Sequence, residues 1–218
     1  MNHFDKKLIY TYDHAISPLL CKTIIDMYEK ADDKYVGVTS GGYNPDRKDT
    51  IDFVIPNGVS AWERINLFLN KELTKNVKTY FNQLNVIEKL DILSPNYMGA
   101  NFFQYDSFMM QKYIKNKGKF EYHNDFSCDH EKSRYRIVTF IFYLNDVVDG
   151  GETEIWGHTH IRPTAGKLLL FPALWTFPHC GKMPISSDKY IITGWIYVNT
   201  NHHVNKRVND LLNNNKTI

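Results

Sequence analysis

The chain has 218 residues, of which 43% are hydrophobic and 14% aromatic, and its formal net charge is +2. This length and apolar content suffice for one good-sized packed domain and argue against wholesale disorder. The near-neutral charge gives no reason to expect strong binding to nucleic-acid phosphates, and no apolar run reaches the roughly 18 residues that a membrane span requires.

The beginning of the sequence and its cysteines bear on the compartment. No apolar stretch resembling the core of a signal peptide follows residues 1–7. Cys21, Cys128 and Cys180 are odd in number and widely scattered, so they do not read as a disulfide framework and fit a reducing compartment. We therefore expect a cytoplasmic protein that is not bound to a membrane.

The first half of the chain is predicted to be mainly helical. Residues 8–12 read as an edge strand. A serine–proline pair ahead of an apolar helical repeat predicts a helix over 18–31. Capping-box spacing and a second apolar stripe predict a helix over 60–82, and 87–93 is predicted as a shorter third helix. These helices carry no residues typical of a chemical site and are interpreted as a scaffold.

Between the first two helices, residues 37–52 are rich in glycine, asparagine, proline and aspartate. Such residues are typical of turns, so the segment is predicted as a long loop. Long loops in compact domains are often binding elements or lids. A surface excursion without a role is the alternative that the sequence leaves open.

The second half is predicted to consist of short strands joined by turns. The expected strands cover 100–105, 109–115, 120–125, 135–145, 152–156, 167–171, 175–180 and 190–198. Residues 116–119 are predicted as a hairpin turn. Seven or eight short strands indicate a sandwich or barrel. We predict one domain over 1–200, with helical support over about 17–93 and a β core over about 100–199, followed by a polar tail over 201–218.

One short stretch carries the strongest chemical signal. If 120–125 is extended, His123 and Asp125 point to the same side of the strand, since residues i and i+2 share a face. His179, in a later strand, is the candidate for a third ligand. Two histidines and one carboxylate on one face of an iron are the ligand set of non-haem Fe(II) oxygenases. A His-x-Asp pair alone would be weak evidence.

Lys189 begins the last apolar strand, ten positions after His179. A lysine that enters a barrel interior needs an anionic partner, because an unpaired buried charge is costly. A small keto-dicarboxylic acid, bound to the metal at one end and to the lysine at the other, would supply that partner.

These residues occur in an order that resembles the Fe(II)/2-oxoglutarate-dependent dioxygenases, and within them the prolyl 4-hydroxylase branch. The resemblance covers about 100–199. It rests on Tyr113 ten residues before His123, Arg136 to Asp146 followed by Gly150-Gly151-Glu152-Thr153, Pro163 to Phe171, and the closing set His179, Gly181, Pro184, Lys189 and Trp195. It implies a mainly β fold with N-terminal helices (α+β), built on a double-stranded β-helix, a cupin-like jelly-roll core with helices packed on one face.

The resemblance also implies a role for each matching residue. The metal ligands would be His123, Asp125 and His179; the 2-oxoglutarate contacts Lys189, Tyr113, Tyr143 and Thr193; and the substrate contacts Arg136, Trp195 and, in a flap over 37–50, Arg47. The cofactors implied are Fe(II), 2-oxoglutarate as cosubstrate and O2, with ascorbate as reductant. The partner is a proline-containing peptide or protein, which a monomer or homodimer would hydroxylate with release of succinate and CO2. The carboxylate at Asp125 favours hydroxylation over halogenation.

Three alternatives remain open at this point. The barrel could oxidise another amino-acid side chain, a small molecule or a nucleic acid, although those relatives mostly anchor the cosubstrate with arginine and the charge argues against nucleic acid. It could also be a jelly-roll binding module without catalysis. Finally, His130, His158 and His160 could suggest a second metal, but they are interpreted as surface residues.

Overall fold

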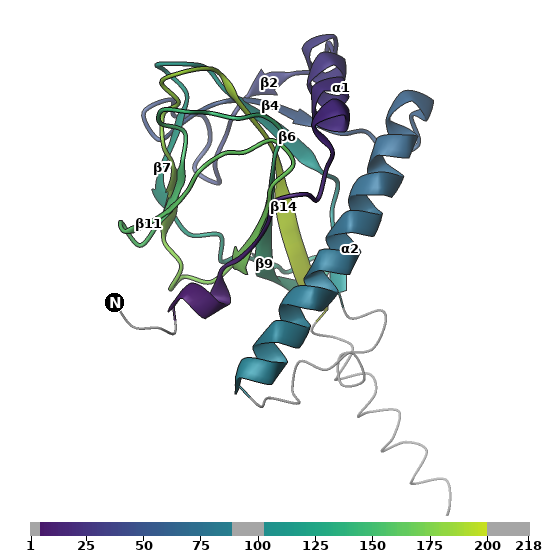
Figure 1. Ribbon diagram of the computed structural model, residues 1–218, viewed down its shortest axis with the longest axis vertical. Helices are drawn as coiled ribbons and strands as arrows, with labels where there is room; N and C mark the ends of the chain where they lie inside the picture. The colour runs from purple at the N-terminus through teal and green to yellow at the C-terminus, as the bar shows by residue number, and fades with distance from the viewer. Residues whose placement is uncertain (1–4, 89–102, 200–218) are drawn as a thin grey trace, which may run out of the picture.

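The structure is a computed structural model that describes residues 5–88 and 103–199 (Figure 1). Its helical elements are η1 (Asp5–Leu8, a 3-10 turn), α1 (Pro18–Glu29) and α2 (Ser60–Glu88). The Ser17 side chain accepts a hydrogen bond from the backbone N–H of Leu20, so α1 begins where the sequence predicts. The helix α2 is longer than predicted because its buried stripe continues to Leu84. Within the described residues, no helix combines the length and apolarity needed to cross a membrane.

Nine strands form the larger sheet. They are β1 (Tyr10–Tyr12), β2 (Tyr35–Val36), β4 (Ile51–Val54), β5 (Phe103–Tyr105), β6 (Met109–Tyr113), β8 (Cys128–Asp129), β9 (Arg134–Tyr143), β12 (Leu168–Pro172) and β14 (Lys189–Asn199). Their order is β1-β12-β9-β14-β6-β4-β2, with β5 paired to β14 and β8 paired to β9. The predicted edge strand near the N-terminus, β1, does lie at one edge.

Five strands form the smaller sheet. They are β3 (Lys48–Asp49), β7 (Lys119–His123), β10 (Thr153–Ile155), β11 (Thr159–Ile161) and β13 (His179–Gly181), in the order β11-β10-β13-β7-β3. From β6 onward the chain alternates between the two sheets: β7 is in the smaller, β9 in the larger, β10 and β11 in the smaller, β12 in the larger, β13 in the smaller and β14 in the larger.

Two facing antiparallel sheets connected in this way form a jelly roll. The sheets stand opposite each other in Figure 1, and both helices lie on the outer side of the larger sheet. The predicted fold class, a mainly β jelly roll with N-terminal helices on one face, is confirmed.

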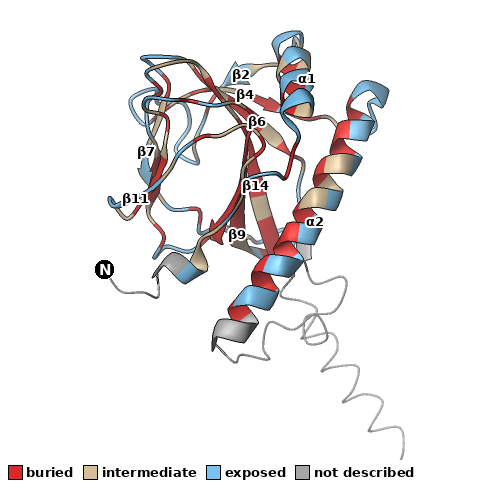
Figure 2. Cartoon of the chain, in the orientation of Figure 1, coloured by how far each residue is buried: buried red, intermediate tan, exposed pale blue. Residues whose placement is uncertain are grey.

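The larger sheet is covered on both faces, because successive apolar side chains along its strands point to opposite sides of the sheet. On β9, Phe140 and Phe142 belong to the cluster that the helices cover, whereas Ile141 and Tyr143 belong to a second cluster between the sheets. Figure 2 shows the side of α2 that faces the sheet as buried and the opposite side as exposed. The strands that carry the site are therefore anchored from behind.

The predicted hairpin at 116–119 is wrong in its pairing. The turn is real: a Cβ on Gly118 would lie 2.6 Å from the Tyr113 Cα, so the chain folds back closely there. However, β6 pairs with β4 and β14, whereas β7 pairs with β13 and β3. The turn therefore transfers the chain from the larger sheet to the smaller one.

The segment 37–52 is more regular than the predicted loop. It contains a bridge between Thr39 and Gly42, then β3, and the first residues of β4. Pairing of Lys48 with Phe120 brings it against β7. The strand β4 was not predicted, because it is short and carries a buried aspartate, Asp52, where an apolar residue would be expected. Most of the predicted third helix and the whole tail over 201–218 lie outside the described residues.

Candidate metal centre

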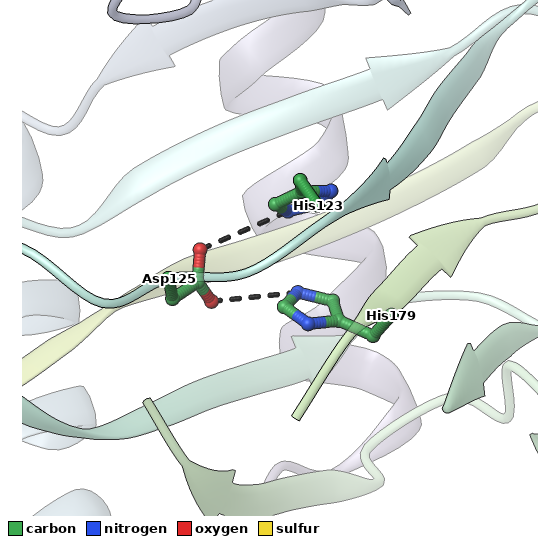
Figure 3. Close-up of side chains that lie close together, drawn as sticks. All are labelled: His123, Asp125 and His179. Carbon is green, nitrogen blue, oxygen red and sulfur yellow. Dashed lines mark ion pairs between the residues drawn. The ribbon is translucent and has the colours of Figure 1, made fainter. Parts of the chain in front are cut away.

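Three side chains from two neighbouring strands converge in the smaller sheet (Figure 3). His123 ends β7, Asp125 follows two residues later, beyond the strand, and His179 begins β13 directly opposite His123. The His123 Nε2 lies 3.7 Å from one Asp125 carboxylate oxygen, and the His179 Nε2 lies 3.4 Å from the other. The potential ligand atoms of the three residues all lie within 4.8 Å of one another. The structure thus brings together the three predicted ligands.

Both imidazoles are held in the same way. The His123 Nδ1 lies 2.8 Å from the carbonyl oxygen of Glu121, and the His179 Nδ1 lies 3.0 Å from that of Phe177. A carbonyl oxygen only accepts, so each Nδ1 carries the proton and each Nε2 presents its lone pair to the centre. Histidines that bind metals typically donate their second nitrogen in this manner.

The carboxylate is oriented from the opposite sheet. The Thr139 hydroxyl on β9 donates a hydrogen bond of 2.7 Å to Asp125. Burial by itself would raise the pKa of Asp125, but the two histidines and this hydroxyl lower it. Asp125 is therefore an anion in the site, as metal coordination requires.

The environment also keeps His123 neutral. Burial and the neighbouring His179 lower the pKa of His123 to about 4. The Phe120 ring stacks on the His123 ring at a centroid distance of 3.6 Å and an interplanar angle of 13°. A neutral, held imidazole beside an anionic carboxylate is the donor set that a divalent transition metal binds, so the residues fit such an ion.

The three side chains line a cavity of about 930 Å³ between the sheets, and a buried lysine lines the same cavity. Lys189 is 1% exposed, and its Nζ donates a 3.0 Å hydrogen bond to the carbonyl of Gly151. Gly151 has φ +76, a conformation that glycine adopts without strain. The ammonium also lies 3.7 Å from the centroid of the Tyr113 ring. Burial lowers the pKa of Lys189 to about 7.

Of the other residues predicted to contact the cosubstrate, Tyr113 and Thr193 line the cavity and Tyr143 does not. Tyr113 lines the cavity and donates a 3.1 Å hydrogen bond to Gln111. Thr193 also lines it, and its hydroxyl donates to the carbonyl of Phe140 at 2.9 Å. Tyr143 is fully buried behind the lining, and its hydroxyl donates at 2.6 Å to Thr153, which does line the cavity.

The three residues predicted to contact substrate all line the cavity: Arg136, Trp195 and Arg47. The guanidinium of Arg136 stacks on the Trp195 ring at 3.5 Å, and its Nε lies 3.4 Å from the Tyr197 hydroxyl. The Trp195 Nε1 is buried and has no hydrogen-bond partner among the described residues. Arg47 is exposed in the segment before β3.

The histidines that were interpreted as surface residues are exposed. This holds for His130, His158 and His160. Within residues 5–88 and 103–199, no other cluster of three histidine, cysteine or acidic side chains offers a metal site.

Sequence reasoning missed several polar residues of the cavity. They are Thr139, Thr153, Gln111 and the buried ion pair Lys48–Asp52, whose atoms lie 2.6 Å apart. The alternation of β9 could have identified Thr139, since it shares a face with Ile141 and Tyr143. Nothing in the spacing of Lys48 and Asp52 points to the cavity, because their segment has no clear periodicity.

Residues 108–197 match the 2OG-Fe(II) oxygenase superfamily, and this range contains the three converging side chains and Lys189. No curated protein matches the chain by sequence.

Several solved structures share the fold. A viral collagen prolyl hydroxylase from Paramecium Bursaria Chlorella virus-1, solved as its 2OG complex, aligns with a TM-score of 0.61 at 17% identity, covering 90% of this chain and 99% of that one. A Pseudomonas putida prolyl-4-hydroxylase aligns with a TM-score of 0.60 at 16% identity, covering 86% and 91%. A Trichoplax adhaerens prolyl hydroxylase, solved with a peptide fragment of the hypoxia inducible factor oxygen degradation domain, gives 0.62 at 17%, covering 90% and 86%. At these identities the likeness concerns the fold.

Proposed function

We propose that this chain, which belongs to the 2OG-Fe(II) oxygenase superfamily, is a 2-oxoglutarate-dependent dioxygenase that hydroxylates peptidyl proline. One observation carries the proposal: two imidazole nitrogens and one carboxylate converge in a cavity that is also lined by a buried ammonium. A metal centre combined with a buried lysine that has no carboxylate partner among the described residues suits a cosubstrate that carries a chelating group at one end and a carboxylate at the other.

In this proposal His123, Asp125 and His179 hold Fe(II). Support comes from the two Nε2 lone pairs that face the carboxylate and from the Nδ1 hydrogen bonds that fix both rings. Three protein ligands leave the remaining coordination positions for small molecules, as in other sites with this ligand set. The Thr139 hydroxyl would keep the carboxylate turned toward the ion.

Lys189 would bind the distal carboxylate of 2-oxoglutarate. One of its three donors is used by the carbonyl of Gly151, which leaves two for an anion. Tyr113, stacked over the ammonium, and Thr193, four residues along the same strand face, line the same space and would orient the cosubstrate. Tyr143 would act through Thr153, to which its hydroxyl donates.

Bound Fe(II), with O2 and 2-oxoglutarate, supplies the oxidising chemistry, in which the cosubstrate leaves as succinate and CO2 and one oxygen atom enters a C–H bond of proline. The contribution of the chain is positional. It holds the cosubstrate at both ends, presents the metal face toward the cavity and surrounds it with apolar side chains from the cluster between the sheets.

The choice of peptidyl proline is supported by the neighbours of known fold, several of which are prolyl hydroxylases, and by the breadth of the cavity. The cavity reaches beyond the metal centre to Arg136, Trp195 and Arg47. This leaves room for residues on either side of a target proline, which a free amino acid would not need.

The test is succinate release from 2-oxoglutarate with Fe(II) and ascorbate, with and without proline-containing peptides, and mass spectrometry of the peptides. We expect peptide-dependent succinate release and a mass increase of one oxygen atom, both lost in His123→Ala. The matched control is His158→Ala, which removes an exposed histidine and should retain activity. Equal turnover by the parent and His123→Ala, or no oxidation of any prolyl peptide, would overturn the proposal.

A further inference from the structure

The charged side chains of the cavity are unequally matched. Four cationic side chains line it, Arg47, Lys48, Arg136 and Lys189, against two carboxylates, Asp52 and Asp125. Only the charges that have no partner within the protein can pair with charges of a substrate.

Both carboxylates are already engaged. The Asp52 carboxylate accepts from Lys48 at 2.6 Å and from the Thr50 hydroxyl at 2.7 Å. The two members of this ion pair are nearly inaccessible, with side chains 4% and 2% exposed, so the charge of Lys48 is already balanced by Asp52. Asp125 faces the two histidines. Neither acidic residue is free to compensate an arginine.

The two arginines have no acidic partner among the described residues. Arg136 is half-buried, and stacking on the Trp195 ring holds its guanidinium flat against the cavity wall. Arg47 is exposed, but its backbone is fixed, because its N–H donates to the carbonyl of Asn44 and its carbonyl accepts from the N–H of Glu121. Two guanidinium groups are therefore presented from positioned backbone, and neither contacts a carboxylate of residues 5–88 or 103–199.

A guanidinium without an acidic partner at a partly desolvated wall binds a carboxylate through two parallel hydrogen bonds, and this geometry is specific for planar anions. The same wall repels a lysine or arginine of an incoming peptide. The nearby exposed aromatic side chain of Phe126, which also lines the cavity, offers apolar contact to the peptide without changing the charge balance.

We propose that the preferred substrates are peptide segments in which an acidic side chain flanks the target proline, with Arg47 and Arg136 as the residues that select it. This inference rests on the proposed function and specifies its substrate class. An exposed ion pair changes binding by up to about fivefold, so one engaged arginine should alter KM by about that factor. The preference should weaken as ionic strength rises.

The experiment compares matched peptides with one central proline, in which Glu, Gln or Lys occupies each flanking position in turn. We expect KM for hydroxylation to increase in the order Glu, Gln, Lys at one or more positions, with little change in kcat. Arg47→Glu should reverse the order at the position that Arg47 reads, and Arg47→Gln should abolish the preference there. Arg64→Glu, an equal change of charge at an exposed position of α2, should leave the order unchanged.

The outcomes separate the two proposals. Hydroxylation of all peptides with equal KM would overturn the inference and leave the proposed function intact. So would an order of KM values that is the same in the parent, in Arg47→Glu and in Arg136→Gln. Absence of hydroxylation in every peptide would instead refute the proposed function and, with it, this inference. The peptide series on the parent protein tests the charge preference even if a variant does not fold.

Discussion

Replacement of Lys189 by methionine should stabilise the protein when no cosubstrate is bound. Lys189 is 1% exposed and has one carbonyl acceptor and one aromatic ring as its contacts. Among the described residues, no carboxylate lies within ion-pair distance of it, and Cys180 and Glu152 only partly offset the lowering of its pKa by burial. Methionine has a similar length and no charge, so it would fill the space without burying an ammonium group.

The magnitude follows from the pKa. Burial lowers the pKa of Lys189 from 10.5 to about 7. Between these values the unfolded chain binds more protons than the folded protein, so the free energy of unfolding rises with pH across this range. At about 1.36 kcal/mol for each pH unit, the buried lysine costs the folded protein about 4 kcal/mol at pH 7 and about 1 kcal/mol at pH 10. The variant should exceed the parent in stability by about these amounts.

Urea unfolding of the parent and Lys189→Met at pH 7 and pH 10 measures both differences. Lys71→Met, at an exposed position of α2, is the control and should change stability by less than about 0.5 kcal/mol. In a parallel series under nitrogen, with Fe(II) present throughout, adding 2-oxoglutarate should raise the urea midpoint of the parent more than that of the variant, since both proteins keep the three candidate metal ligands. A variant less stable than the parent at pH 7, or a difference that does not shrink toward pH 10, would refute the reasoning.

Three further predictions follow from contacts around the site. Thr139→Val removes the hydroxyl that donates to Asp125, so Fe(II) should bind about tenfold more weakly in a metal titration. Thr139→Ser keeps a hydroxyl and should bind Fe(II) as the parent does. Equal affinity in all three proteins would contradict this role. Gly181→Val places a side chain against the Tyr113 ring, which lies 3.0 Å from the position that a Cβ would occupy. KM for 2-oxoglutarate should therefore rise while the affinity for Fe(II) stays unchanged. An unaltered KM would contradict a role of Tyr113 in binding the cosubstrate. Asp52→Asn leaves its buried lysine partner unpaired and should lower the free energy of unfolding by about 3 kcal/mol in urea titrations, a loss that a surface ion pair would not produce.

The sequence predicted that His123 and Asp125 lie together because the determinant of this pair is local. The period of two along a strand places His123 and Asp125 together even though Asp125 lies just beyond the strand. Lys189 begins an apolar strand that the sequence marks clearly, whereas the strand predicted over 175–180 is only partly right, because β13 begins at His179 and residues 175–178 are not strand. The change of pattern from helices to short strands indicated a sandwich or barrel, and the resemblance to the dioxygenases specified the jelly roll.

The parts that sequence reasoning did not predict depend on contacts between distant segments. The 116–119 turn looks like a hairpin locally, and only the competition of β4 and β14 for β6 shows that it joins two sheets. The ion pair of Lys48 and Asp52 is internal to the segment 37–52, but its burial depends on packing against β6 and β7. The sequence shows which residues could pair, but it does not show which distant segments pack over them and bury them.

The pairing of β7 with β13 sets His123 directly opposite His179. Since successive side chains of a strand point to opposite sides, a shift of either strand by one residue would turn its imidazole outward. Only correctly aligned strands can then hold the ion, and any ligand that binds the native state alone stabilises it by mass action. Bound iron would therefore stabilise the native register of β7 and β13 selectively, and it would shift the population of chains away from misaligned pairings of the smaller sheet.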